Sequence, residues 1–169
     1  MRQKYKWHSS FTLEFNRMGF LMHQLRSSQV LPLPPEETFV FFEDPRNLSA
    51  ITPDWLDFRM RNPDLHEVYE GAEFDYTIRW LGFRFAWRSR IVEYEPPDRF
   101  TDIQRIGPYR SWEHLHTFER VPEGTLMQDT VTYSFSLPAV TLHRFLIRKQ
   151  LENIFSFRSV KITEWAEAN

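Results

Sequence analysis

Five polar side chains lie where the sequence otherwise predicts the buried face of a β-sheet. Alternate residues of a strand share one face, so each strand divides into an inward and an outward set. The inward sets, recognised by their bulky apolar members, also contain Asp102, Gln104, His114, His116 and Asp129. A buried polar group destabilises a protein unless it is hydrogen-bonded or paired. We therefore expect these five side chains to have partners.

The predicted hairpins indicate which side chains face each other. A reversal at residues 107–109, and a second hairpin closing on residues 122–123, together set the alignment of three strands. The opposed pairs are then Asp102 with His114, Gln104 with Trp112, and His116 with Asp129. This register predicts two Asp–His pairs side by side, and a slip of two residues would break both.

Three interpretations of this cluster stay open. It could be a structural cluster that fixes strand register and binds nothing. It could be the polar end of an apolar cavity, orienting the head group of a ligand whose body lies against aromatic side chains. It could be catalytic, because an Asp-oriented histidine, either His114 or His116, suits general acid–base chemistry such as enolisation, aldol cyclisation or dehydration. Arg158 aligns with the apolar stripe of the last predicted helix and would direct a cation toward the same space.

Other chemistry has weaker support. Two histidines two residues apart on a strand point the same way, as metal ligands do, but a bare His-x-His is weak evidence. The sequence contains no glycine-rich phosphate loop and no nucleophile-elbow serine. We therefore predict neither a metal nor a cofactor.

The elements that must position these residues follow from the hydrophobic period. The pattern predicts a first strand at residues 21–30, which ends at the prolines that follow. Two short helices follow, one opened by Glu36 and Glu37, the other capped by Asn47. From about residue 55 to 137 apolar residues alternate with polar ones, and short turns predict an antiparallel meander that includes strands at 99–106, 110–120 and 125–136.

A long helix is expected at residues 140–166. Its apolar stripe consists of Ile147, Leu151, Ile154, Phe155, Ile162 and Trp165. The elements predict an α+β domain in which a curved antiparallel sheet wraps around this C-terminal helix. Such curling can leave a cavity between sheet and helix.

Composition narrows the class of protein. The 169 residues include 16 Phe, 6 Trp and 6 Tyr, side chains that often line sites for flat or apolar ligands. A net charge of −2 with interspersed signs argues against nucleic-acid binding. No cysteine is present, which excludes disulfides and thiolate catalysis, and no apolar run predicts stable membrane insertion. The expected location is cytoplasmic.

Several motifs are similar to those of a known family. They are residues 33–37, 41–48, 51–53, 87–91, 95–100, 102–104, 107–109, 112–118 and 129–133. Over residues 20–165 the chain resembles the START and polyketide cyclase/dehydrase (SRPBCC) superfamily, in a bacterial branch described as ligand-binding or cyclase/dehydrase-like. The resemblance implies the helix-grip fold and a cavity for a lipid, quinone or polyketide-like ligand. Similar domains occur fused to epimerase-like sugar-nucleotide domains. The resemblance therefore implies that an epimerase-like enzyme is a possible partner of this protein.

The sequence thus predicts a START-like binding domain at residues 21–169 for a small hydrophobic ligand, with a cyclase/dehydratase or a closed interaction domain as alternatives. Residues 1–20 are an extension that adds a strand or frays. The predicted ligand-binding residues are Phe74, Tyr76, Trp87, Asp102, Gln104, Trp112, His114, His116, Phe118, Asp129, Tyr133 and Arg158. Ile51, Trp55 and Leu56 are expected to form a lid. Long edge strands leave pairing as a homodimer open.

Overall fold

The computed structural model describes residues 7–15, 21–62, 64, 67–80, 82–135 and 146–169. Its strands are β1 (His8–Phe15), β2 (Leu21–Leu31), β3 (Arg59–Met60), β4 (Glu73–Trp80), β5 (Phe83–Glu95), β6 (Arg99–Ile106), β7 (Ser111–Val121) and β8 (Gly124–Ser134). Its helices are α1 (Pro35–Glu43), the short 3-10 helices η1 (Pro45–Ser49) and η2 (Asp54–Leu56), and the long α3 (Arg148–Ala168).

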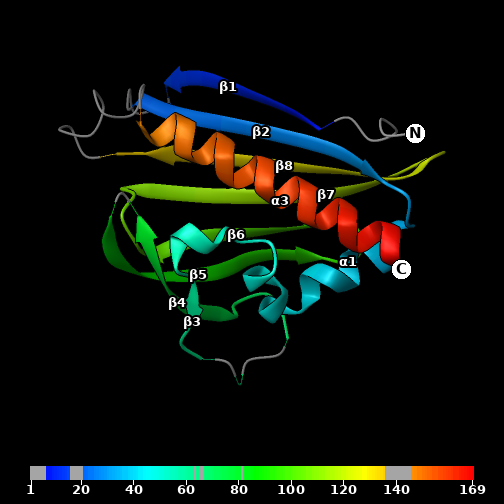
Figure 1. Ribbon diagram of the computed structural model, residues 1–169, viewed down its shortest axis with the longest axis horizontal. Coiled ribbons are helices and arrows are strands. Elements are labelled where there is room, and N and C mark those ends of the chain that lie inside the picture. Colours follow the sequence, from blue (N-terminus) through cyan, green and yellow to red (C-terminus); the bar gives the residue numbers. More distant parts are fainter. Residues whose placement is uncertain (1–6, 16–20, 63, 65–66, 81, 136–145) are drawn as a thin grey trace.

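The described strands form one antiparallel sheet in the order β1-β2-β8-β7-β6-β5-β4-β3 (Figure 1). Short turns join β4 through β8 into a meander, as the turn residues predict. The β7–β8 hairpin closes with Val121 opposite Gly124. Gly124 has a φ of 131°, and a side chain there would meet the backbone carbonyl of Leu31, so glycine is required at this close approach.

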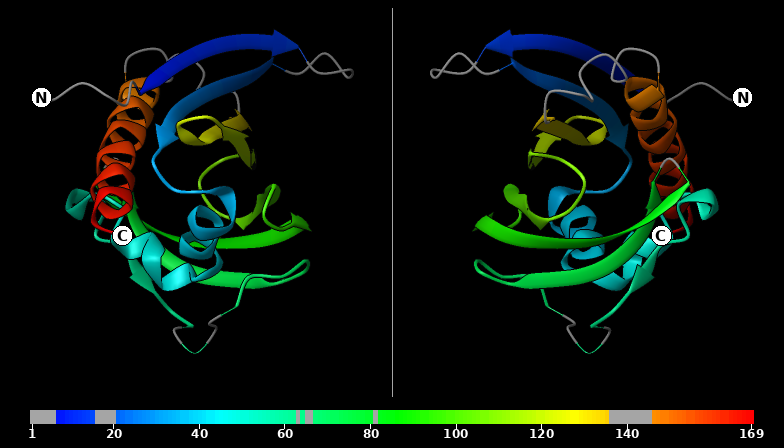
Figure 2. Two further views of the ribbon diagram at one scale, coloured as in Figure 1. Left: turned by 90° about the vertical axis from the view of Figure 1, so that its right-hand side faces the viewer. Right: turned by 90° about the vertical axis from the view of Figure 1, so that its left-hand side faces the viewer.

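The sheet curls around α3, which crosses its concave face (Figure 2). The pairing of β5 with β6 is interrupted by a β-bulge between Ile91 and Glu93. Such bulges increase the bend of a strand. The α+β helix-grip architecture predicted from the sequence is therefore confirmed. None of the helices in the described part of the chain is long and apolar enough to cross a membrane.

The core lies between the concave face and α3. Of the predicted stripe, Leu151, Phe155 and Ile162 of α3 and Ile147, which immediately precedes it, are at most 3% exposed. Ile154 and Trp165 are half-buried and pack against the core. Toward the C-terminal end of α3 the core includes Phe39 of α1, which packs against Phe100 and Phe118. Toward the other end it includes Leu25 and Tyr133.

Most element boundaries agree with the sequence predictions. Of the two alternatives for the extension, residues 8–15 form a strand, β1, which pairs along its length with β2. The cap of η1 was wrongly assigned to Asn47: the side chain of Asp44 accepts from the backbone N–H of Arg46 at 2.9 Å, whereas Asn47 donates to the carbonyl of Phe41. Asp44 precedes Pro45, which is well placed to start a helix one residue after its cap. Residues 140–145 of the predicted helix lie outside the described residues.

Candidate functional site

A cavity of about 190 Å³ lies between the concave face of the sheet and α3. For comparison, an apolar cavity of roughly 150 Å³ binds benzene. The aromatic side chains that line it are Phe41, Phe42, Phe58, Phe74, Tyr76, Trp80, Trp87, Phe100, Tyr109, Trp112 and Phe155. The space therefore suits a small and largely apolar compound.

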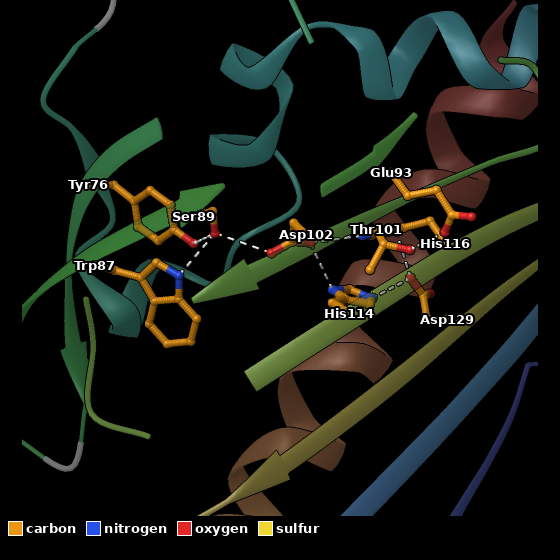
Figure 3. Close-up of polar contacts among 9 residues, drawn as sticks. All are labelled: Tyr76, Trp87, Ser89, Glu93, Thr101, Asp102, His114, His116 and Asp129. Carbon is orange, nitrogen blue, oxygen red and sulfur yellow. Dashed lines mark hydrogen bonds and ion pairs between the residues drawn. The ribbon is translucent and has the colours of Figure 1, made fainter. Parts of the chain in front are cut away.

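One wall of the cavity carries a row of polar side chains drawn from successive strands (Figure 3). This polar row consists of Tyr76 on β4, Ser89 on β5, Asp102 on β6, His114 and His116 on β7, and Asp129 on β8. All except Asp129 line the cavity, and Asp129 lies behind the histidines. Because alternate residues face the same side, neighbouring strands in register bring these side chains into a line across the sheet.

The predicted register is confirmed: Asp102 is opposite His114, and His116 is opposite Asp129. The hydrogen bonds, however, run diagonally. His114 Nε2 contacts Asp129 Oδ1 at 2.8 Å, and His116 Nε2 contacts Asp102 Oδ2 at 3.3 Å. The centres of the two imidazole rings lie 3.7 Å apart. Each histidine lies within 4 Å of both carboxylates.

The two predicted Asp–His pairs are thus also linked to each other, and the four residues form one cluster, termed here the His–Asp cluster (Asp102, His114, His116, Asp129). The contacts within the predicted pairs join His114 Nδ1 to Asp102 at 3.8 Å and His116 Nδ1 to Asp129 at 3.1 Å. The latter pair of atoms is not aligned for a hydrogen bond. Strand twist brings diagonal neighbours within reach of long side chains, which spacing along the sequence does not reveal.

Burial and mutual charge set the protonation of the cluster. Burial and the neighbouring charge of His116 lower the pKa of His114 to about 4. Burial also opposes protonation of His116, but its hydrogen bond to Asp102 and the negative charges of Asp102 and Asp129 outweigh burial and raise its pKa. Burial opposes ionisation of both carboxyls, yet the hydrogen bonds from the histidines lower the pKa of Asp102 and of Asp129. Near pH 7 the cluster thus holds two carboxylates and a neutral His114, its net charge is negative, and His116 is the histidine that protonates more readily.

At the Tyr76 end of the polar row, the number of available hydrogen atoms determines which groups donate and which accept. Ionised Asp102 only accepts, so the single hydroxyl hydrogen of Ser89 points to Asp102 Oδ1 at 3.2 Å. Ser89 Oγ must then accept from Trp87 Nε1 and from the Tyr76 hydroxyl, each at 3.1 Å. Tyr76 consequently offers only oxygen lone pairs to the cavity.

Arg158 of α3 also lines the cavity. Its guanidinium carbon lies 5.2 Å from the centre of the Phe155 ring. Its Nε is buried and has no hydrogen-bond partner. Among the residues the structure describes, no carboxylate lies close enough to form an ion pair with it.

The structure brings most of the predicted site residues to the cavity, but not all. Those that line it are Phe74, Tyr76, Trp87, Asp102, Trp112, His114, His116, Arg158, Ile51 and Leu56. The predicted residues outside the lining are Gln104, Phe118, Asp129, Tyr133 and Trp55.

Gln104 holds the β6–β7 turn, donating to the carbonyl of Tyr109 at 2.8 Å. Phe118 and Tyr133 are packed into the core, at 2% and 0% exposed. Trp55 of the expected lid is 48% exposed and does not line the cavity.

The sequence profile of a family described as "Polyketide cyclase / dehydrase and lipid transport" matches residues 31–158. The chain belongs to this family. None of the curated proteins matches the chain.

Solved structures agree with this family's fold. Protein CV1439 from Chromobacterium violaceum has a TM-score of 0.66 at 16% identity, covering 85% of this chain and 97% of its own. CalU16 from Micromonospora echinospora has a TM-score of 0.58 at 16% identity, covering 96% and 95%. TTHA0849 from Thermus thermophilus has a TM-score of 0.62 at 20% identity, covering 86% and 97%. At these identities the likeness concerns the fold alone.

Sequence reasoning missed several cavity residues of this polyketide cyclase/dehydrase family member. Ser89 shares the inward face of Trp87 and Ile91, and a small polar residue there was the available signal. Tyr109 follows a turn glycine and proline, and its 6% exposure was not predictable from a turn position. Phe42 and Phe58 come from segments without strand alternation.

Three side chains of the cluster also have the residue types of a metal site. One ligand atom from each of Asp102, His114 and His116 lies within 4.8 Å of the other two, and two histidines with one carboxylate can bind Fe(II) or Zn(II). In this structure both histidines already contact the Asp102 carboxylate, and a metal would have to replace these contacts. The absence of a metal stays a prediction.

Proposed function

We propose that this protein binds a small, largely apolar ligand in the cavity between sheet and α3. The observation that supports this most directly is an aromatic-lined cavity with polar groups converging on one wall. In such sites the apolar wall supplies affinity and the few polar groups fix orientation. The family description, which includes lipid transport, is consistent with this role.

The aromatic wall would hold the ligand body, while Tyr76, Asp102 and His114 would orient its polar end. Ile51 and Leu56, near the 3-10 helices, would cover it as a lid. An epimerase-like partner enzyme, pairing as a homodimer and a cytoplasmic location stay predictions from the sequence.

Native mass spectrometry of freshly purified protein tests this function. We expect a reproducible excess mass that leaves on denaturation and that appears in an organic extract as one class of compound. Ile154→Trp, which fills the cavity from α3, should abolish the excess mass. Val160→Trp, on the same helix but 52% exposed, should retain it. An excess mass equal in both variants, or no bound compound in any of them, would argue against the proposal, and an excess of one metal ion would identify a metal site instead.

A second candidate function is a small cyclase or dehydratase. The neutral His114 favours it, because its Nε2–H is held by Asp129 and its Nδ1 retains a lone pair. A neutral imidazole with a free lone pair is the form that removes a proton next to a carbonyl, and the lowered pKa keeps His114 in that form at neutral pH.

This candidate function predicts base-catalysed exchange of the α-protons of 2-tetralone, a two-ring ketone, in D2O. General-base catalysis by a positioned side chain accelerates such steps by roughly 10²–10⁴-fold. NMR should show this acceleration with the wild-type protein and its loss in His114→Gln, while His8→Gln, an exposed histidine, should behave as wild type. Equal exchange with and without His114 would leave binding as the function.

A further inference from the structure

Arg158 is the one lysine or arginine that lines the cavity among the described residues. Elsewhere on the molecule arginines mostly pair with carboxylates, such as Arg88 with Asp75 at 2.7 Å and Arg120 with Glu36 at 2.6 Å. Arg158 differs from these in facing an apolar space with no carboxylate within ion-pair distance in the described part of the chain.

The chemistry of this position is that of an incomplete anion site. The Nε–H of Arg158 is buried without a hydrogen-bond acceptor, and a buried donor without a partner destabilises the protein. A guanidinium cannot lose its charge in proteins, and its planar donors match the oxygens of a carboxylate. The Phe155 ring beneath it fixes its position without satisfying those donors.

We propose that Arg158 binds the anionic group of the ligand, so that the cavity takes amphipathic organic acids in preference to neutral compounds of the same size. This proposal rests on the proposed binding function and specifies the chemical class of its ligand. The aromatic wall accommodates the apolar body. The lone pairs of Tyr76, which also lines the cavity, accept from a hydroxyl group of the ligand if it carries one.

A competing explanation is that Arg158 only balances the negative charge of the His–Asp cluster across the cavity. The two explanations predict different ligand preferences. If Arg158 serves only the cluster, an added anion gains nothing from it, and acids and alcohols of equal size bind alike. If Arg158 is the anion site, the acid binds more tightly and the preference depends on this side chain.

The test uses two matched pairs of probes at pH 8, octanoate with octan-1-ol and 3-phenylpropanoate with 3-phenylpropan-1-ol, and measures their dissociation constants by calorimetry. We expect the wild-type protein to bind each acid about tenfold more tightly than its alcohol, since a hydrogen bond to a charged group contributes roughly 1.5–3 kcal/mol. Arg158→Gln should remove the preference and leave alcohol binding within about threefold. Lys161→Gln, which removes one charge from the same helix at a residue paired with Glu164, should retain it.

Arg158→Lys keeps the charge and should retain part of the preference, which covers the case in which Arg158→Gln does not fold. Equal binding of acids and alcohols by the wild type, or a preference that persists in Arg158→Gln, overturns the anion site and leaves the proposed binding function standing. Failure of all four probes to bind overturns both.

Discussion

Asp129→Asn is expected to destabilise the protein by about 3 kcal/mol at pH 6, because breaking a buried ion pair leaves a charge without compensation. Asp129 is 8% exposed at its side chain and is shared by His114 and His116. Asparagine has the same shape and still accepts one hydrogen bond, so the loss comes from the missing charge. Urea denaturation followed by circular dichroism measures the change in the free energy of unfolding.

The effect should depend on pH in a defined direction. The pKa of His116 is raised above its usual 6.5, so the stability it contributes is fully present below pH 6.5 and is lost as the pH rises through its folded-state pKa. Without the charge of Asp129 this contribution is reduced, because only Asp102 still raises the pKa of His116, and the destabilisation is therefore larger at pH 6 than at pH 9. Asp129 itself, with a lowered pKa, is ionised at both values.

Glu113→Gln is the matched control for this substitution, because it removes an exposed carboxylate from the neighbouring strand β7. Surface substitutions of this kind usually change stability by less than about 0.5 kcal/mol. An Asp129→Asn variant as stable as Glu113→Gln at pH 6 would mean that the cluster is not ionised as described.

Phe155→Ala is expected to destabilise the protein by roughly 3–5 kcal/mol, the range for truncating a buried phenylalanine. Phe155 is 3% exposed, lies over the His114 ring at 5.6 Å between centroids, and lines the cavity. Its removal therefore also enlarges the ligand site. The variant should favour dodecan-1-ol over octan-1-ol more strongly than the wild type does, by about threefold or more, given roughly 0.8 kcal/mol per buried methylene.

Phe39→Ala separates the two effects of that truncation. Phe39 is 2% exposed and packs against Phe100 and Phe118, away from the cavity lining. This variant should lose comparable stability, yet its preference between the two alcohols should match the wild type. A change in size preference in both variants, or in neither, would show that Phe155 does not limit the cavity.

The fold was largely predictable because its turns carry strong local signals. Gly107-Pro108 and Pro122-Glu123-Gly124 fix two hairpin lengths, and those lengths determine that Asp102 lies opposite His114. The apolar stripe of α3 needed only its helical period. The capping residue of η1 was harder to predict, because Asp44 and Asn47 are both good capping residues. Only the folded structure shows that Asn47 instead donates to the carbonyl of Phe41.

The site was predictable only in part, because spacing gives the face of a residue and not its rotamer. The inward histidines and aspartates were identified, whereas their diagonal hydrogen bonds depend on strand twist. Gln104 has the same inward pattern as Asp102, but a nearby turn offers its amide two backbone partners and removes it from the cavity. Ser89 was overlooked because serine is common on strands, and its role follows only from the groups around it.

The polar row also bears on how the chain avoids misfolded pairings. A strand that slips by two residues keeps its apolar side chains inward, so the hydrophobic effect distinguishes poorly between native and slipped sheets. In this protein such a slip on β7 would keep one histidine opposite a carboxylate but place the other carboxylate opposite Trp112 or Phe118, where it would be buried without its partner. Polar groups of this kind widen the energy gap between the native sheet and its near-native competitors, so the side chains of the polar row would also penalise kinetic traps during folding.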